Sequence, residues 1–161
     1  MARFDNEIRI IASVLDRLID YEPELSHEPL LARAKSLRQL KQSVRRDLEW
    51  LLNTRQTPIE LAPELQEVNR SLFVYGLPDF TNLSVKNPEE VEQMRREIAR
   101  AIEIFEPRLQ DIQVTLEPLY ELEHALHFRI DGQLKIEPAP EPVTFDTILR
   151  LDSGRYVVEG E

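Results

Sequence analysis

The sequence predicts an α+β fold, a small and mainly antiparallel sheet with helices packed on one face. Two observations predict it. Up to residue 105, apolar residues recur at intervals of three and four, as on one face of a helix. Beyond residue 108 they alternate with polar residues, as in strands that bury one face. Helices that precede all the strands are typical of α+β folds.

We expect two parts: an N-terminal helix and linker over residues 1–28, and a single α+β domain over residues 29–161. The first helix is indicated by apolar residues at helical spacing, which are Phe4, Ile8, Ile11, Leu15 and Leu18. The stretch from Glu22 to Pro29 contains two prolines and is typical of a linker. Residues 1–28 should therefore be dispensable for folding of the remaining chain.

The next two helices are predicted on either side of an irregular, proline-containing connection. A long helix runs from about Pro29 to Asn53, and Asn53 is expected to end it in left-handed geometry. Its apolar stripe consists of Leu30, Ala34, Leu37, Leu40, Val44, Leu48 and Leu51. The short helix that follows is indicated by Leu65, Val68, Leu72 and Tyr75. Gly76 can end this short helix in left-handed geometry.

The last helix is the best defined, and it ends in a distinctive corner. Asn87 can cap its start, and Glu90 completes a capping box. Its apolar stripe consists of Val91, Met94, Ile98, Ile102 and Phe105. Pro107 disfavours helical geometry at Glu106, so the helix should stop sharply and set Glu106 beside Arg108.

Two interpretations of this corner are open at the level of the sequence. Arginine is the usual residue for forked recognition of carboxylate or backbone oxygens at interfaces, so Arg108 could contact a partner. The alternative is a helix stop with a local ion pair between Glu106 and Arg108. Such a pair would contribute little to stability if it were exposed.

Four strands are predicted after the corner: Ile112–Leu116, a strand around residues 126–136, Phe145–Leu151 and Arg155–Val158. In the second strand, Asp131-Gly132 resembles a two-residue hairpin turn. A turn there would point Leu134 and Ile136 away from the core. A single long strand keeps every apolar residue on one face, so we predict the long strand. A sheet of about four strands that does not close leaves edges at which a partner strand can add.

The composition excludes several classes of function. A net charge of −10 argues against general nucleic-acid binding and against docking on anionic membranes. No apolar run is long enough to predict membrane insertion. The absence of cysteine excludes disulfides and thiol catalysis and fits a cytoplasmic protein. Residues 30–46 carry six bases and no acid, so this face could dock on a charged partner or simply be solvated.

Few residues could carry catalysis or bind a metal ion. His124 and His127 lie three apart but face opposite sides of a strand, which disfavours a metal site, and His27 is the third histidine. Glycosidases need two acids that flank a cleft. Glu106 and Glu117 are the acids nearest the corner, but nothing in the sequence forces them together. We therefore expect no catalytic residue, no cofactor and no metal ion.

Several segments together resemble one family, the type VI secretion baseplate subunit TssE. The segments occur in the family's order: Ser13–Leu18, Ser43–Arg55, Tyr75–Phe80, Phe105–Leu109, Glu137–Val143 and Phe145–Thr147. Each segment is weak evidence alone, whereas the ordered series is highly specific. The wider family includes the baseplate wedge proteins of contractile phage tails, some of which have been labelled lysozyme-like.

The resemblance implies a cytoplasmic, non-enzymatic scaffold. Such a protein links the wedge made by TssF and TssG to the first ring of the contractile sheath and helps start sheath assembly. The resemblance also implies that Glu106, Pro107 and Arg108 bind protein, by docking on the helical core bundle of the wedge. The C-terminal sheet would exchange strands with sheath subunits, and other baseplate proteins would be further partners.

Three alternatives stay open. The chain could be the wedge protein of a phage tail or of an extracellular contractile particle, which its genome neighbours would decide. It could be an anti-adaptor that uses the same fold to block a proteolysis adaptor. The least favoured alternative is a glycan hydrolase, which would require peptidoglycan hydrolysis that disappears with Glu106→Gln.

Overall fold

The computed structural model describes residues 13–18, 33–59, 61–80, 87–117, 125–150 and 153–160. In chain order its elements are α1 (Val14–Leu18), α2 (Arg33–Asn53), the 3₁₀ turns η1 (Val68–Arg70) and η2 (Leu72–Val74), α3 (Pro88–Phe105), β1 (Leu109–Leu116), β2 (Ala125–Leu134), β3 (Glu141–Arg150) and β4 (Arg155–Glu159). The predicted linker, the predicted helical residues before Ser13, His27 and His124 lie outside the described residues.

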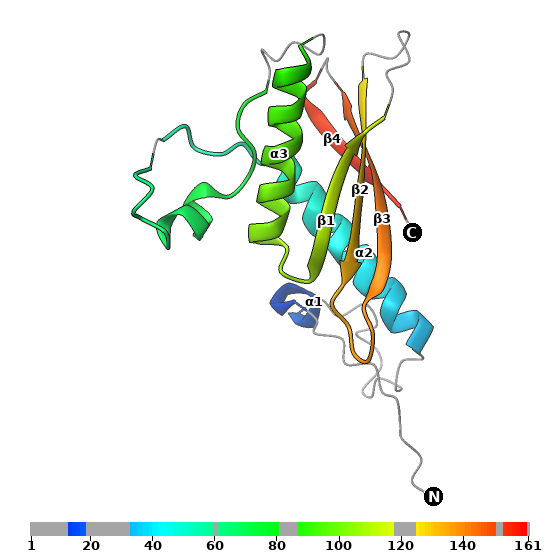
Figure 1. Ribbon diagram of the computed structural model, residues 1–161. Coiled ribbons are helices and arrows are strands. Elements are labelled where there is room, and N and C mark those ends of the chain that lie inside the picture. Colours follow the sequence, from blue (N-terminus) through cyan, green and yellow to red (C-terminus); the bar gives the residue numbers. More distant parts are fainter. Residues whose placement is uncertain are drawn as a thin grey trace, which may run out of the picture.

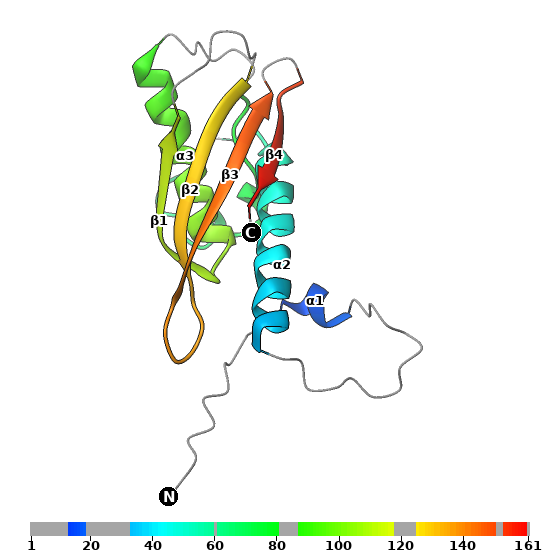
Figure 2. The same ribbon diagram turned by 90° about the vertical axis from the view of Figure 1, so that its right-hand side faces the viewer.

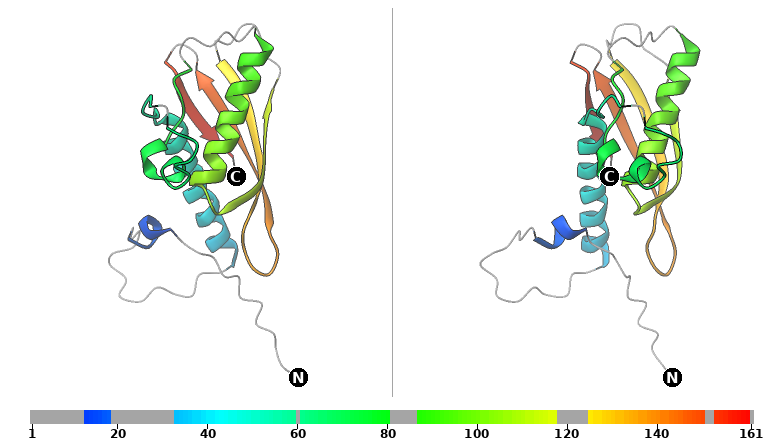
Figure 3. Two further views of the ribbon diagram at one scale, coloured as in Figure 1. Left: turned by 60° about the vertical axis from the view of Figure 1, so that its left-hand side comes forward. Right: turned by 90° about the vertical axis from the view of Figure 1, so that its left-hand side faces the viewer.

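The strands form one antiparallel sheet in the order β1-β2-β3-β4, and α2 and α3 cover one of its faces (Figures 1 and 3). α3 lies against β1, and α2 lies against β4. In Figure 2 the sheet is seen with α3 behind it. The predicted α+β fold, with helices on one face of the sheet, is confirmed. No helix within the described ranges has the length and apolar character needed to cross a bilayer.

β2 runs without a turn through Asp131 and Gly132, as predicted. The large apolar residues at its even positions, with Ile136 just beyond it, are all buried: Leu126, Phe128, Ile130, Leu134 and Ile136. Gly132 lies close to the bulge in β1 between Gln110 and Gln113, where Asp111 has a φ of 53°. A Cβ atom on Gly132 would stand 3.4 Å from the Gln110 carbonyl oxygen. Gly132 therefore lies within a continuous strand, opposite the bulge of β1, and not in a hairpin turn.

α3 begins and ends where the sequence predicts. The Asn87 side-chain oxygen accepts a hydrogen bond from the Glu89 N–H at 3.1 Å, and its amide donates to the Glu90 carboxylate at 2.8 Å. At the other end, the Glu106 N–H donates to the Ile102 carbonyl at 2.8 Å and closes the last turn. The buried face of α3 consists of Met94, Ile98, Ala101 and Ile102.

The prediction of a single short helix after residue 63 was wrong. Two 3₁₀ turns, η1 and η2, occupy this region, because Ser71 between them is extended, with a ψ of 169°. The Ser71 hydroxyl accepts a hydrogen bond from the Phe73 N–H at 3.3 Å, which starts a new turn instead of continuing the first. Leu72, which the predicted stripe placed in the core, is exposed. Gly76 does adopt the expected positive φ, at 108°.

The prediction that Asn53 ends α2 in left-handed geometry was also wrong. Asn53 is the last helical residue, and Asp111 is the only non-glycine residue with a positive φ in the described part of the chain. The Asn53 side chain instead reaches β4. Its Oδ1 accepts a hydrogen bond from the Tyr156 N–H at 3.0 Å, and its Nδ2 donates to the Tyr156 carbonyl at 2.8 Å. One amide side chain thus pairs with both backbone groups of a strand residue.

The core-facing side of β3 contains a buried hydroxyl, that of Thr147, whose Oγ1 has no hydrogen-bond partner among the described residues. Burial of an unsatisfied polar group is unfavourable, so we expect Thr147→Val to raise the free energy of unfolding by about 1 kcal/mol. That gain corresponds to a rise in Tm of roughly 2–4 °C, measurable by thermal denaturation. Thr144→Val on the same strand is the control, because the exposed Thr144 hydroxyl donates to Asp131 at 2.7 Å. An unchanged Tm for Thr147→Val would contradict the prediction.

Candidate functional site

Hydrogen bonds fix the backbone of the corner between α3 and β1. Glu106 is 3% exposed, whereas Pro107 is exposed and Arg108 is half-buried. The Leu109 N–H donates to the Glu106 carbonyl at 3.1 Å, which closes the turn. Lys135, just beyond β2, donates its N–H to the Arg108 carbonyl at 2.8 Å and its ammonium group to the Pro107 carbonyl at 2.9 Å. The sheet therefore fixes the direction in which the corner points.

Four side chains form a cage around the Arg108 guanidinium. The Glu106 carboxylate accepts from Nε and from Nη2, both at 2.6 Å, and Asp47 of α2 accepts from Nη2 at 2.6 Å. Nη1 donates to the Ser43 hydroxyl at 3.1 Å and to the Asp16 carboxylate of α1 at 3.3 Å. A guanidinium has five N–H donors, so the cage can satisfy all of them. The cage joins α1, α2 and the corner.

A second arginine, Arg46, completes the charge arrangement. Its Nη2 lies 2.9 Å from Asp16 and 2.8 Å from Asp47. Two arginines thus face three carboxylates, those of Asp16, Asp47 and Glu106, and the cluster carries one net negative charge. Because each carboxylate has an arginine partner, no charge in this cluster is buried alone.

The hydrogen bonds of the cluster stabilise the charged forms of its members. Burial raises the pKa of Asp16, but hydrogen bonds from Ser13 and Arg46 outweigh this effect and hold the pKa below its ordinary value. Burial lowers the pKa of Arg108, but its hydrogen bond and charge interaction with Glu106 outweigh burial, and the pKa is raised. Both side chains are therefore charged at neutral pH.

A pocket of about 370 Å³ opens beside the cage. Its apolar walls are Trp50, Leu51, Tyr75, Phe105 and Pro107, and its polar walls are Ser13, Asp47, Glu106 and Arg108. The Tyr75 and Phe105 rings meet edge-on with their centroids 5.1 Å apart. The Arg46 guanidinium lies over the Trp50 ring, 5.2 Å from its centroid. This arrangement can accept an apolar side chain next to a fixed cation.

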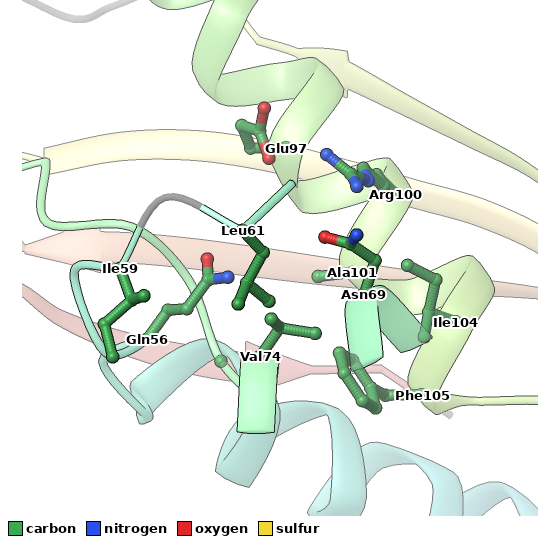
Figure 4. Close-up of a pocket in the computed structure, with 11 residues that line it drawn as sticks. Gln56, Ile59, Leu61, Asn69, Val74, Glu97, Arg100, Ala101, Ile104 and Phe105 are labelled. Atoms are coloured by element: carbon green, nitrogen blue, oxygen red, sulfur yellow. The ribbon is translucent and has the colours of Figure 1, made fainter. Parts of the chain in front are cut away.

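A smaller pocket, of about 190 Å³, lies where the segment between α2 and α3 packs against α3 (Figure 4). Leu61, Val74 and Ile104 line its interior, and Glu97 and Arg100 of α3 lie to one side. Phe105 lines both pockets. Packing of the segment that carries η1 and η2 therefore supports one wall of the pocket beside Arg108.

The structure separates the two acids that could have formed a glycosidase pair. Glu106 and Glu117 lie beyond opposite ends of β1, which has eight residues. At about 3.3 Å per residue they are roughly 25 Å apart, far beyond the 5–9 Å that glycoside hydrolysis requires. Glu117 instead pairs with Arg129 at 2.6 Å. Within the described ranges, no group of three or more histidine, aspartate or glutamate residues is placed to hold a metal ion.

The sequence analysis named Glu106 and Arg108 of the cage as candidate site residues. It did not single out Asp16, Ser43 and Asp47, although they lie in the TssE-like segments Ser13–Leu18 and Ser43–Arg55. These lie 92, 65 and 61 positions from Arg108, so no local pattern connects them to it. One signal was available, because Ser43 and Asp47 are four residues apart on a helix. They share the face of α2 that borders its apolar stripe, where polar side chains need a partner.

The outer edge of β1 is a second candidate site. The Glu117 N–H donates to the His127 carbonyl at 2.8 Å, so the alternate residues Leu116 and Val114 turn their backbone groups away from β2. Arg95 of α3 donates to the Val114 carbonyl at 3.2 Å. Beside this edge lies an open groove of about 560 Å³, lined by Pro88, Val91, Glu92, Arg95, Val114, Thr115 and Leu116. A helix and a strand edge thus border one groove.

Comparisons with known proteins identify a family. The family described as "Baseplate wedge protein gp25" matches residues 38–139, well over half of the chain. A chain in the solved structure titled "The baseplate complex from the type VI secretion system" is 22% identical, with a TM-score of 0.47 and coverage of 74% of this chain and 95% of that chain. No curated protein matches. The family match spans most of α2, all of α3 and the Arg108 corner, and the chain therefore belongs to the family of baseplate wedge protein gp25.

Proposed function

We propose that this chain is a baseplate subunit of the TssE type in a type VI secretion system. It is a cytoplasmic, non-enzymatic scaffold that links the wedge made by TssF and TssG to the first ring of the contractile sheath. Membership of the gp25 family carries the proposal. The ordered series of TssE-like segments narrows it from contractile baseplates in general to the secretion system.

In this proposal the corner at Glu106, Pro107 and Arg108 binds the wedge. The three residues have different roles in this proposal, because Glu106 is buried and Pro107 is exposed. The Glu106 carboxylate orients the Arg108 guanidinium through its hydrogen bonds, while Pro107 and the accessible side of Arg108 contact the partner. The neighbouring pocket would receive an apolar side chain of the wedge. Aromatic walls beside an arginine are typical of the residues that dominate binding energy at interfaces.

Co-expression with TssF, TssG and the sheath subunits encoded beside this chain's gene tests the proposal. We expect the tagged chain to recover the TssF–TssG complex and, in a separate reaction, the sheath subunits. Asp146→Asn, on the open face of the sheet, is the control for an exposed charge away from both candidate sites. Recovery of neither partner would refute the proposal. Phage tail genes as neighbours would favour the phage or extracellular-particle alternative.

We further propose that the sheath adds a strand at β1. A groove between a helix and a strand edge that pairs with no other described strand suits an extended peptide, because the edge offers backbone groups and the groove receives alternate side chains. The opposite edge suits this role less well. On β4, the outward N–H and C=O of Tyr156 are already bonded to Asn53.

Leu116→Pro tests the β1 edge. The Leu116 N–H points away from β2, so proline removes a backbone donor that an added strand would use. We expect recovery of sheath subunits to fall at least about tenfold, while the TssF–TssG complex still co-purifies. Leu116→Ala is the matched control, because it shortens the side chain and keeps the N–H. Equal sheath recovery by the two variants would show that recruitment uses side chains or another edge.

A further inference from the structure

The face of the sheet that points away from α2 and α3 carries an ordered pattern of side chains on β3 and β4. Residues on this open face alternate with residues that are buried on the helix side, which are Phe145, Thr147, Leu149, Tyr156 and Val158. The antiparallel register places the open-face residues in directly opposed pairs. Three pairs follow one another along the strands: an acidic row of Asp146 and Glu159, an apolar row of Ile148 and Val157, and a basic row of Arg150 and Arg155.

These three rows are accessible to a partner. The four charged side chains are exposed, and the two apolar ones are half-buried. Like charges directly opposite one another on neighbouring strands are unfavourable, so the acidic row and the basic row each cost free energy in the isolated chain. Arg129 of β2 partly offsets this cost in the acidic row, because its Nε lies 3.3 Å from the Asp146 carboxylate. A partner that brings the opposite charge to each row would offset the rest.

The three rows are complementary to themselves. A two-fold axis that runs along the apolar row, between two facing sheets, reverses the strand direction of one copy relative to the other. The basic row of each copy then lies over the acidic row of the other, and the two apolar rows meet at the centre. The rows stay in register, because each row is two residues, or roughly 6.7 Å, from the next along the strands. We propose that this face of β3 and β4 binds a second copy of the chain through the three rows.

The dimensions and charges of the open face allow this contact. Facing sheets pack about 10 Å apart, a gap that arginine and acidic side chains from opposite faces can span together. The net charge of −10 opposes association of two copies. That repulsion is largely screened beyond about 8 Å at physiological ionic strength, whereas the opposed rows are in contact. Because three pairs make a small contact, we expect a weak dimer, with a dissociation constant on the order of 100 µM.

A second copy fits this face better than an unrelated protein. A foreign surface would have to present basic, apolar and acidic rows in the reverse order and at the same spacing, whereas every copy of this chain already does so. Edge-to-edge pairing of two copies through β4 is disfavoured, because Asn53 bonds the outward N–H and C=O of Tyr156. The inference is independent of the proposed function, since neither the Arg108 corner nor the β1 edge contributes to the rows.

Sedimentation equilibrium of the full chain, at concentrations from about 5 to 500 µM, tests the inference. We expect the parent chain to shift from monomer to dimer over this range. Arg150→Glu/Arg155→Glu makes both charged rows acidic, so its dissociation constant should rise at least about tenfold. Arg38→Glu/Arg45→Glu, at exposed positions of α2, is the matched control. The control changes the net charge by the same amount and should dimerise like the parent.

A charge-swap experiment tests whether the rows themselves make the contact. Asp146→Lys/Glu159→Lys makes both charged rows basic, and this variant alone should also be monomeric. Its fold should survive, because Arg129 keeps its ion pair with Glu117 at 2.6 Å. Mixed with the variant whose charged rows are both acidic, it should form a heterodimer at least as tight as the parent dimer, because every charged row then meets its opposite. Thermal denaturation checks that both variants are folded.

Two results would overturn the inference. A parent chain that stays monomeric at the highest concentration would leave the rows to a different protein. Two folded charge variants that fail to bind each other would place any dimer contact elsewhere on the molecule. Neither result bears on recovery of the TssF–TssG complex, so the proposed function stands or fails separately.

Discussion

Arg108→Ala is expected to lower the free energy of unfolding by about 3–5 kcal/mol and to abolish wedge binding. The loss of stability follows from Glu106, whose side chain is 4% exposed and takes two of its hydrogen bonds from the guanidinium. Without Arg108, the buried Glu106 carboxylate loses the one partner of opposite charge that it has among the described residues. In thermal denaturation the loss corresponds to a fall in Tm on the order of 10 °C.

This expectation corrects the one drawn from the sequence. An exposed ion pair between Glu106 and Arg108, which the sequence left open, would contribute only about 0–1 kcal/mol, and Arg108→Ala would then leave the Tm nearly unchanged. The Arg108 side chain is only 15% exposed, and its other partners come from α1 and α2. Because of these contacts, which are distant in sequence, Arg108 belongs to a buried network and not to a local ion pair. Arg108 therefore supports the fold as well as the proposed interface.

A second variant separates stability from binding. In Glu106→Gln/Arg108→Ala the buried group is neutral, so we expect at least about 1 kcal/mol of the lost stability to return. Wedge binding should not return, because the guanidinium is still absent. Recovery of binding together with stability would mean that the corner acts only through the fold. Arg108→Lys should give an intermediate Tm and weak binding, since a point charge cannot reproduce the planar fork.

Gly76→Ala is expected to lower the free energy of unfolding by about 3 kcal/mol. Gly76 has a φ of 108°, and a Cβ atom there would lie 2.4 Å from the Thr54 carbonyl oxygen. That oxygen accepts the Leu77 N–H at 2.8 Å, and the Leu77 carbonyl accepts the Gln56 N–H at 2.8 Å. The clash is with backbone that is itself hydrogen-bonded, so no rotamer change can relieve it.

Gly154→Ala provides the matched control for conformational strain. Gly154 has a φ of 64°, but the nearest atom to its added Cβ would be an Arg55 nitrogen at 4.0 Å. Its cost should therefore stay near the roughly 1 kcal/mol of an unfavourable backbone conformation. Chemical denaturation measures both values. Equal losses in the two variants would show that the close approach at Thr54 is easily relaxed.

The elements that were predictable are those whose signal is local. The helix ending at Phe105 carries its own cap, stripe and stop, and the parity of Leu126 through Ile136 fixed the long strand despite Gly132. The partners of Arg108 and of Asn53 could not be predicted in the same way. Asn53 meets Tyr156 from 103 positions away, and neither residue differs in its local sequence from an ordinary cap or strand residue. Such contacts depend on how helices and strands that are distant in sequence pack against one another.

The Asn53 side chain affects how two copies of this chain could meet through their β4 strands. By bonding both backbone groups of Tyr156, it imitates one residue of a neighbouring strand and blunts that margin of the sheet. Two copies approaching through their β4 strands would each meet an amide already in place. The two margins of the sheet therefore differ: the outward backbone groups of Tyr156 on β4 are already bonded, whereas an open groove lies beside β1.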